Sequence, residues 1–476
     1  MPLSGKLLSE GCKRMFSAED SGCTRREFLR RGMEAVLAAG VGIGSARQPV
    51  ASSSKASSEA WPIRPPVGRR RPSPNERIQV ACIGLGQRGS QHLHGLESVP
   101  GAAVVALCDV DRRVLYRQAE EFRQRTGRAV RLEVDYRRLV EQPDIDAVAV
   151  ATCNHTHAVI AAAALRAGKH VYVEKPCSHN LWEGEQLVRA AQKYGRICFH
   201  GVQARTSPAV QEAIQRLQGG LIGQVRLARI RAIRAGPPPP PMPDEPTPPA
   251  VAYDLWLGPA AHRPFNRTRF HRDWRWWPEY GNGPLANQAF HLLDLARWGL
   301  AVDWPLRIRP VRNPPQQADT LLAGAGLEIW HVEFPAQKAI RVELWPASGW
   351  GASVGSASWG AETVTFYGTD GQMEVDCFGY RTWWADGREP GPRQEAPPQE
   401  FEEFIRAVHS GQIPPRGPDI LQGHFSSGLL HLVNIARELG RTVRFDPARQ
   451  SILTDSQAFP LARPEYRKPF LMPEIA

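Results

Sequence analysis

A glycine-rich run, Gly84-Leu-Gly-Gln-Arg-Gly89, directly follows an apolar, β-rich stretch over residues 78–83. Glycine at the first, third and sixth positions permits a tight turn, a close approach of the backbone to a pyrophosphate, and tight packing of the next helix on the strand. The free N–H groups at the start of that helix suit phosphates. The alternative is a glycine turn in an unrelated α/β domain. We predict a dinucleotide-binding loop formed by Gly84, Gly86, Gln87, Arg88 and Gly89.

An acidic residue, Asp109, follows 20 residues after Gly89, at the end of the second predicted strand. A carboxylate at this point accepts hydrogen bonds from the hydroxyls of the adenosine ribose, which favours NAD over NADP. Arg112 and Arg113 follow closely, and an arginine here accommodates a 2′-phosphate. We therefore predict NAD as the cofactor, with NADP as the alternative.

Short apolar runs alternate with helical stretches over residues 77–203, which predicts a parallel sheet with crossover helices, a Rossmann domain. The predicted strands are residues 78–83, 103–107, 145–151, 170–173 and 197–199, and the helices are 111–126, 156–167 and 181–194.

Beyond Gln203 the pattern changes, and residues 204–470 are predicted to form a second domain for substrate binding and oligomerisation. Five consecutive prolines, residues 237–241, lie in a stretch from 236 to 250 that we expect on the surface. The predicted strands are residues 225–233, 327–334, 338–345 and 362–367, with a hairpin at 369–371, and the helices are 286–299, 399–409 and 419–439.

Tryptophan is concentrated in this second part, where Trp274, Trp276 and Trp277 stand in one segment among His271, Arg272, Asp273 and Arg275. Aromatic platforms beside hydrogen-bonding groups suit a sugar, which has an apolar face and a hydroxyl edge. Tryptophans that pack a domain interface explain the segment equally well.

The run Glu174-Lys-Pro176 closes the strand at 170–173, and Ala151-Thr-Cys-Asn-His-Thr-His157 precedes it. With residues 253–259, 269–277 and 287–300, these motifs resemble the Gfo/Idh/MocA family (glucose–fructose oxidoreductase, inositol dehydrogenase, MocA). The resemblance covers roughly residues 77–470, and its last blocks are similar to a branch common among exported bacterial members. It implies an N-terminal Rossmann domain, a C-terminal α/β domain with a large, mostly antiparallel open sheet, and a homo-oligomer.

The resemblance also implies site residues. Thr152, Asn154, His157, Glu174 and Lys175 would contact the cofactor, although capping or loop hydrogen bonds explain His155 and His157 equally well. Oxidation of a secondary alcohol needs a base and a cation beside the developing alkoxide, and we assign these roles to His291 and Lys175. Typical family members carry Asp-x-x-x-His where this chain has Asn287 and His291. Asn287 cannot ionise, but it can orient a substrate hydroxyl. Asp294 is interpreted as an ordinary helix residue rather than an orienter of His291.

Three functions are consistent with these predicted site residues. The first is an NAD(P)-dependent oxidoreductase that transfers hydride between the cofactor and a hydroxyl of a sugar, glycoside or cyclitol. The second is a redox-neutral, NAD-dependent enzyme that cleaves glycosides. The third is a catalytically silent protein that binds NAD or a sugar, which the absence of the family acid at Asn287 permits. The intact Glu174-Lys-Pro176 favours the first, since glycosidases of the family depart from that motif.

The amino terminus predicts export. Arg25 and Arg26, followed by Arg30 and Arg31, precede a ten-residue apolar run over 35–44 and the small residues of 44–46. This pattern resembles the twin-arginine signal, so residues 1–46 are predicted to be a signal peptide and the mature protein periplasmic or exported. An amphipathic helix is the alternative. Residues 47–76, rich in Ser, Pro and Arg, are predicted to be a disordered linker.

Charge and cysteine content limit the partners. The formal net charge is +11, but residues 1–77 contain fourteen Lys or Arg against seven Asp or Glu, so only four positive charges remain beyond them. We therefore predict no nucleic-acid partner. No stretch approaches the ~20 unbroken apolar residues of a membrane helix, so no membrane is expected for the mature form. Cys82, Cys108 and Cys198 lie in apolar runs as buried thiols, and no spacing predicts a metal site or a disulfide framework.

Overall fold

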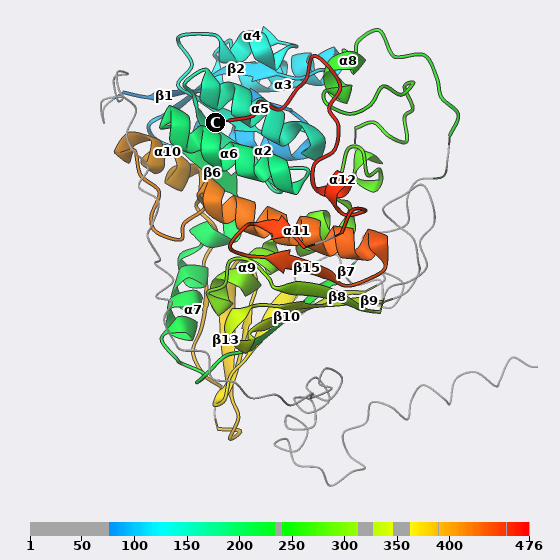
Figure 1. Ribbon diagram of the computed structural model, residues 1–476. Helices are drawn as coiled ribbons and strands as arrows, with labels where there is room; N and C mark the ends of the chain where they lie inside the picture. Colours follow the sequence, from blue (N-terminus) through cyan, green and yellow to red (C-terminus); the bar gives the residue numbers. More distant parts are fainter. Residues whose placement is uncertain are drawn as a thin grey trace, which may run out of the picture. The chain divides into compact units, whose positions relative to one another are not determined.

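The computed structural model describes residues 76–233, 240, 242–271, 273–312, 327–345, 362–388, 390–453 and 455–475 (Figure 1). The predicted signal peptide and all of the predicted linker except Glu76 lie outside these residues, as do Arg272 and most of the proline run.

Within the described residues the first sheet has six parallel strands, in the order β3-β2-β1-β4-β5-β6. From β1 the chain adds β2 and β3 on one side and then returns to add β4, β5 and β6 on the other side. The boundary between β1 and β4 is therefore the topological switch point, where doubly wound sheets bind ligands. The predicted Rossmann sheet is confirmed, whereas β3 was not predicted because it is only three residues long, two of them charged, and is largely exposed. The strands are β1 (Ile78–Ile83), β2 (Ala102–Cys108), β3 (Arg131–Glu133), β4 (Ala147–Val150), β5 (His170–Glu174) and β6 (Cys198–Gly201).

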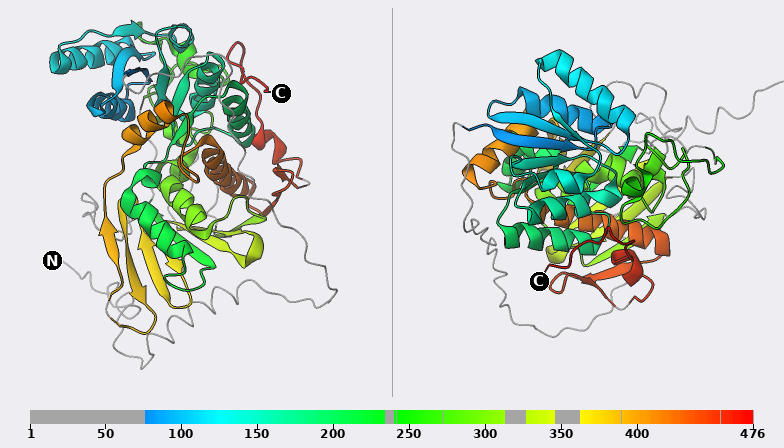
Figure 2. Two further views of the ribbon diagram at one scale, coloured as in Figure 1. Left: turned by 90° about the vertical axis from the view of Figure 1, so that its left-hand side faces the viewer. Right: turned by 90° about the horizontal axis from the view of Figure 1, so that it is seen from above.

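Helices pack on both faces of this sheet (Figure 2). One face is covered by α2 (Gln87–Ser98), α3 (Arg112–Thr126) and, from much later in the chain, α10 (Glu400–Ser410). The other face is covered by α4 (Tyr136–Val140), α5 (Asn154–Arg166) and α6 (Leu181–Tyr194). Because both faces are buried, the central strands are apolar throughout, and every residue of β4 is buried.

The second sheet has ten strands in the described part of the chain, in the order β14-β13-β12-β11-β7-β10-β9-β8-β15-β16. Only β7 and β10 pair in parallel there, so the predicted mostly antiparallel sheet is confirmed. The predicted hairpin at 369–371 joins β11 and β12. The strands are β7 (Leu227–Ile233), β8 (Arg307–Arg312), β9 (Glu328–Glu333), β10 (Ala339–Trp345), β11 (Thr363–Tyr367), β12 (Gly371–Val375), β13 (Gly379–Trp384), β14 (Arg393–Glu395), β15 (Val443–Asp446) and β16 (Ser451–Ile452).

One face of the second sheet packs against three helices, α7 (Pro208–Gln218), α9 (Phe290–Leu300) and α11 (Ile420–Leu439). Figure 1 shows α11 lying between the two sheets, where it contacts α6 on one side and α9 on the other. A π-helical turn, η4 (Leu285–Ala289), leads directly into α9. Shorter helical elements are η2 (Gln203–Thr206), α8 (Tyr253–Leu257), η3 (Asp273–Trp276), η5 (Pro335–Gln337) and α12 (Phe459–Ala462).

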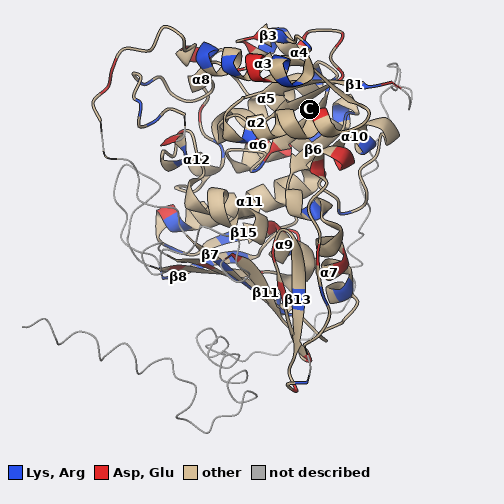
Figure 3. Cartoon of the chain, turned by 180° about the vertical axis from the view of Figure 1, so that it is seen from behind, with Lys and Arg blue, Asp and Glu red and all other residues tan. Residues whose placement is uncertain are grey.

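Charged residues of both signs are interspersed along α3 and along the strands of the second sheet (Figure 3). The ion pairs Arg229–Glu343 and Arg307–Glu333 join neighbouring strands of that sheet. Among the described helices, none is both long and apolar enough to cross a membrane. The thiols of Cys82, Cys108 and Cys198 are free and buried, as predicted.

Candidate functional site

A cavity of about 540 Å³ lies at the carboxyl ends of β1, β2, β4 and β5. Its floor is formed by residues that directly follow these strands. They include Gly84 and Gly86 after β1, Asp109 after β2, Thr152 and Asn154 after β4, and Lys175 after β5. The second part of the chain supplies the opposite wall, which includes Trp256, His271, Trp274, Arg275 and Asn287.

The three glycines of the loop after β1 differ in what surrounds them. Gly84 has a φ of +82°, a conformation that favours glycine. A Cβ on Gly89 would lie 1.7 Å from the Gly84 carbonyl oxygen, so Gly89 permits α2 to pack against the loop. A Cβ on Gly86 would meet nothing within 4 Å, and Gly86 lines the cavity. The open side of Gly86 is the space that a pyrophosphate needs, and these residues therefore fit a dinucleotide.

The amino terminus of α2 is also suited to phosphate. The helix has twelve residues, no side chain caps its first turn, and that turn contains no acidic residue. Gln87 and Arg88 both line the cavity. The unpaired N–H groups of the first turn are thus left available to an anion.

Asp109 lines the cavity at the end of β2, as the sequence predicted. Its Oδ2 accepts the Leu85 N–H at 2.7 Å and its Oδ1 accepts the Asp111 N–H at 2.9 Å, which ties the glycine loop to the carboxylate. Burial raises the pKa of Asp109, although these two hydrogen bonds oppose the shift. Arg113, the residue considered for a 2′-phosphate, instead donates to Asp111 through Nε at 3.0 Å and Nη2 at 2.7 Å.

Glu174 anchors a buried network beside the loop. Its Oε1 accepts from Arg88 Nε at 2.6 Å and lies 2.9 Å from His92 Nε2, and Arg88 also reaches Glu400 of α10 at 3.0 Å. Burial opposes ionisation of Glu174, but Arg88 and His92 hold the pKa of its carboxyl well below the usual range. Sequence reasoning missed His92 and Glu400, because neither belongs to a motif and Glu400 lies more than 200 residues from Glu174.

Lys175 connects the two parts of the chain. Its Nζ donates to the carbonyl oxygens of Ala286 at 3.0 Å and Asn287 at 3.1 Å, both in the π-helical turn before α9. A π-turn disturbs the regular hydrogen bonds of a helix, and such turns are frequent at functional sites. Burial lowers the pKa of Lys175 to about 8, with Glu174 opposing the shift and Arg275 adding to it.

Asn287 and His291 stand four residues apart, across the junction of the π-turn with α9. Asn287 lines the cavity and is exposed. His291 is half-buried, and its Nδ1 has no hydrogen-bond partner among the described residues. Burial, together with the charge of Lys175, lowers the pKa of His291 to about 3. His291 is therefore uncharged at neutral pH, and Lys175 is the group of this pair that titrates nearest to neutrality.

Several residues that follow β4 line the cavity, and two histidines of this segment contact backbone carbonyl oxygens. Thr152, Asn154 and His157 all line it. The ring nitrogens of His157 lie 2.7 Å from the Pro176 carbonyl oxygen and 3.0 Å from that of Thr152. His155 is buried, with Nε2 2.9 Å from the Trp256 carbonyl oxygen. Both histidines thus take part in loop hydrogen bonds, one of the two roles considered for them.

The aromatic segment of the second part packs as a cluster and also forms a wall of the cavity. Trp256, Phe270 and Trp274 belong to one buried group, and all three line the cavity. Trp277 donates its Nε1–H to the Thr268 carbonyl oxygen at 2.7 Å. These aromatic side chains therefore pack together, which is the alternative considered for them, and Trp274 also lines the cavity.

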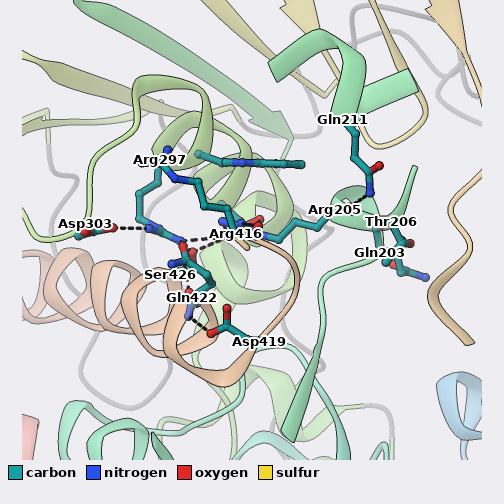
Figure 4. A network of polar contacts seen from close by, with 12 residues as sticks. Gln203, Arg205, Thr206, Gln211, Arg297, Asp303, Arg416, Asp419, Gln422 and Ser426 are labelled. Carbon is teal, nitrogen blue, oxygen red and sulfur yellow. Dashed lines mark hydrogen bonds and ion pairs between the residues drawn. The ribbon is translucent and has the colours of Figure 1, made fainter. Parts of the chain in front are cut away.

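Asp294 is not the ordinary helix residue that the sequence suggested. Its carboxylate is fully buried and accepts both Arg205 Nε at 2.7 Å and Arg205 Nη2 at 2.8 Å, along with the Ser426 hydroxyl at 2.6 Å. Burial opposes its ionisation, yet Arg205 and Arg297 lower the pKa of Asp294 to about 2. The surrounding network, which includes Arg297, Gln422 and Ser426, fastens α9 to η2 and α11 (Figure 4).

Comparison with known proteins identifies the architecture. Residues 78–202 match the family GFO_IDH_MocA, described as an oxidoreductase family with an NAD-binding Rossmann fold. Residues 240–326 match the C-terminal alpha/beta domain of the same oxidoreductase family. Two segments of the chain, which together make up less than half of it, are therefore similar to the two domains of the Gfo/Idh/MocA family.

Relatives within the family differ in their reported activities. The chain is 32% identical over 215 residues to a glycosyl hydrolase family 109 protein of Saccharopolyspora erythraea, covering 42% of this chain and 44% of that protein. It is 30% identical over 153 residues to a myo-inositol 2-dehydrogenase of Thermotoga maritima, covering 32% of this chain and 44% of that protein. The chain thus spans less than half the length of these relatives.

The fold also matches solved structures. One is a myo-inositol dehydrogenase of Lactobacillus casei in complex with NAD(H) and myo-inositol. The TM-score is 0.54 at 19% identity, covering 78% of this chain and 97% of that one. At this identity the match establishes the shared fold. Residues 78–202 thus form an NAD-binding Rossmann domain, consistent with the glycine loop, the start of α2 and Asp109.

Proposed function

We propose that the protein is an NAD-dependent oxidoreductase that transfers hydride between the cofactor and a hydroxyl of a sugar, glycoside or cyclitol, with NADP as the alternative cofactor. The observation that carries this proposal is the position of Lys175. Its ammonium lies between the carboxyl end of β5 and the π-turn before α9, in the cavity that the glycine loop also lines. A cation at this point stabilises the alkoxide that develops when an alcohol is oxidised.

When bound, NAD accepts the hydride, and the protein supplies position and proton transfer. Lys175 has two of its three N–H donors on backbone carbonyls, so the third is left for the reacting oxygen. The charge of Lys175 lowers the pKa of His291, so at neutral pH Lys175 is protonated and His291 is neutral. Loss of that proton leaves a base beside the substrate hydroxyl.

A redox-neutral glycoside-cleaving enzyme is the second candidate, favoured by the 32% identity with the glycosyl hydrolase family 109 protein. Both candidates need the same first oxidation, so Lys175 and His291 serve either one. They differ in whether reduced cofactor accumulates.

Variants of the two residues test the proposal. Lys175→Ala and His291→Ala should each lower turnover by about 10²- to 10⁴-fold, while NAD binding changes much less, because each residue acts mainly in the transition state. The double variant should lose less than the product of the two factors, since both residues serve one reacting oxygen. If both single variants turned over a confirmed substrate at the wild-type rate, the active site would have been placed on the wrong residues.

A further inference from the structure

A segment of the second part of the chain, residues 250–271, is attached to the carboxyl edge of the first sheet, and we call it the strap. At one end it pairs with the residues that follow β2. Asp111 and Val251 form an antiparallel bridge, and the residues on either side of this pair exchange two backbone hydrogen bonds, of 2.9 and 2.8 Å. Figure 1 accordingly shows α8, the helix of the strap, beside α3, which begins directly after Asp111.

The strap is also attached on the far side of the switch point, to the residues that follow β4. His155 Nε2 lies 2.9 Å from the Trp256 carbonyl oxygen. Near the carboxyl end of the chain, Arg467 donates to the Asp254 carboxylate at 2.5 Å, which fixes α8 from a third direction. Because β1 lies between β2 and β4 in the sheet, the strap spans the crevice into which the glycine loop opens.

Strap residues line the cavity together with apolar and aromatic residues that follow β2 and β3. The strap contributes Leu255, Trp256, Phe270 and His271, and the Rossmann domain contributes Val110, Val114, Val134 and Tyr136. Asp109, the predicted ribose ligand, precedes Val110 and also lines the cavity. The adenosine half of a dinucleotide extends from the pyrophosphate towards this acidic residue. The strap therefore covers the adenosine end of the cofactor site.

A side-chain contact joins the strap to the Rossmann domain at this end. His271 Nε2 lies 2.9 Å from Asp111 Oδ2, and Asp111 is buried whereas about half of the His271 side chain, 51%, is exposed. His271 has a φ of +51°, a left-handed conformation that costs free energy and persists only where surrounding contacts compensate. Arg113 binds the same carboxylate at 2.7 Å. The contact with His271 can therefore open without leaving a buried charge unpaired.

We infer that the strap closes over the adenosine half of NAD, that the Asp111–His271 contact is its latch, and that opening of this latch limits the rate at which the cofactor enters and leaves. The inference goes beyond the proposed oxidation, because it concerns the exchange of the cofactor whichever substrate is oxidised. A latch between two parts of the chain biases the open and closed forms with or without the cofactor. Weakening it therefore raises the rate constants of association and dissociation together and leaves the Kd nearly unchanged. Loss of a direct contact with the cofactor raises mainly the dissociation rate constant.

Stopped-flow fluorescence of NADH measures both rate constants without a substrate, by mixing for association and by displacement with excess NAD for dissociation. His271→Asn introduces a residue type that tolerates the left-handed φ, but its side chain is too short for the contact with Asp111. We expect both rate constants to rise by about 2- to 12-fold, the equivalent of one hydrogen bond. Arg267→Gln is the matched control, because Arg267 lies in the strap but is exposed and paired with Glu245. Its two rate constants should equal those of the wild type.

A disulfide tests the closure in the opposite direction. The two backbone hydrogen bonds flank Asp111 and Val251, so these residues form a non-hydrogen-bonded pair, in which the Cα atoms lie about 4.5 Å apart, within the range of a disulfide. The oxidised double variant Asp111→Cys, Val251→Cys should release NADH more slowly than its reduced form, by about tenfold or more. Because the two redox forms share the same sequence, the loss of the Asp111 cap of α3 affects both equally. Wild-type protein treated with the same oxidant and reductant controls for the native cysteines.

Three results would overturn the inference. In the first, His271→Asn leaves both rate constants at their wild-type values. In the second, dissociation alone becomes faster, which would make His271 a direct contact of the cofactor rather than part of a latch. In the third, the disulfide forms, as mass spectrometry shows, yet NADH leaves as fast as from the reduced form. Failure of the proposed function has a different signature, since these rate constants would be unaffected while no polyol is oxidised.

Discussion

The Lys175 ammonium donates to the carbonyl oxygen of Asn287 across 3.1 Å, so the residue after β5 holds the π-turn that begins α9. The bond joins a motif of the Rossmann domain to a segment more than 100 residues later. Both residues line the cavity. The chemistry proposed for Lys175 and the placement of Asn287 and His291 therefore depend on each other.

Gly86→Val should abolish NAD binding and leave the fold intact. The Gly86 φ of −64° is open to any residue, and nothing lies within 4 Å of the added Cβ, so the side chain would enter only the space reserved for the pyrophosphate. Calorimetric titration with NAD and a thermal melt are the two measurements. Gly89→Ala is the contrasting variant, since its Cβ meets the Gly84 carbonyl oxygen and should lower the melting temperature. Undiminished NAD affinity in Gly86→Val would remove this loop from the cofactor site.

Asp109→Asn should weaken NAD more than NADP. The amide retains an oxygen for the Leu85 N–H of the glycine loop, whereas the acceptor for the Asp111 N–H and the charged acceptor for the ribose hydroxyls are lost. A hydrogen bond to a charged group contributes about 1.5–3 kcal/mol, which sets the expected loss of NAD affinity. Titration of both cofactors against wild type and variant measures it. An equal loss for NAD and NADP would show that Asp109 does not discriminate between them.

Oxidation of the alcohol should become faster as the pH rises through about 8. Lys175 has its pKa lowered to about 8, and its neutral form can take the substrate proton, after which the resulting ammonium stabilises the alkoxide. Asn287→Asp should move this transition to higher pH, because a carboxylate beside Lys175 stabilises the ammonium. A pH profile of kcat/KM for both proteins gives the two transitions. A profile that is flat between pH 7 and 9, or unmoved by Asn287→Asp, would exclude Lys175 as the titrating group.

Asp294→Asn should destabilise the protein by about 3–5 kcal/mol, because it leaves the buried Arg205 without its carboxylate. Asp303→Asn is the matched control. Asp303 contacts Arg297 at 3.2 Å but is largely exposed, so its loss should cost little. Urea denaturation measures both.

The same carboxylate predicts an acid-dependent loss of stability. With a folded pKa of about 2 against an unfolded value of 3.8, the stabilisation from Asp294 is complete above about pH 4 and is lost as the pH falls towards 2. The Asp294→Asn variant should lack this component. Equal pH dependence in wild type and variant would contradict the network as the source.

We also propose export by the twin-arginine route, on the strength of Arg25 and Arg26 and the weak apolar run that follows. A reporter fused after residue 60 should cross the inner membrane, and the double change Arg25→Lys, Arg26→Lys should prevent this. The same fusion with Arg30→Lys, Arg31→Lys serves as the control. Normal export of the Arg25→Lys, Arg26→Lys variant would show that export does not depend on these two arginines.

Sequence patterns predicted the first sheet and the glycine loop because those features are local, whereas the mostly antiparallel second sheet was implied by the family resemblance. The β1 strand, the three glycines and Asp109 lie within about 30 residues, and their spacing has a direct geometric meaning. The short strand β3 was not predicted, since no apolar periodicity marks it.

The residues of the site that the sequence did not predict depend on long-range packing. Glu400 reaches Arg88 only because α10 returns to the first sheet, and no spacing encodes that return. The interpretation of Asp294 failed for the same reason, because its partners Arg205 and Ser426 come from distant elements. The low pKa of His291 follows from its burial and from Lys175, and neither can be read from the residue type.

The central claim is tested most directly by incubating the purified protein and NAD with a panel of neutral and anionic polyols and recording the absorbance band of NADH. The account predicts that at least one polyol generates NADH in step with a keto product, and that Lys175→Ala abolishes the signal while still binding NAD. Cleavage of a glycoside without accumulation of NADH would favour the redox-neutral candidate. Binding of NAD with no change in any polyol would contradict the account.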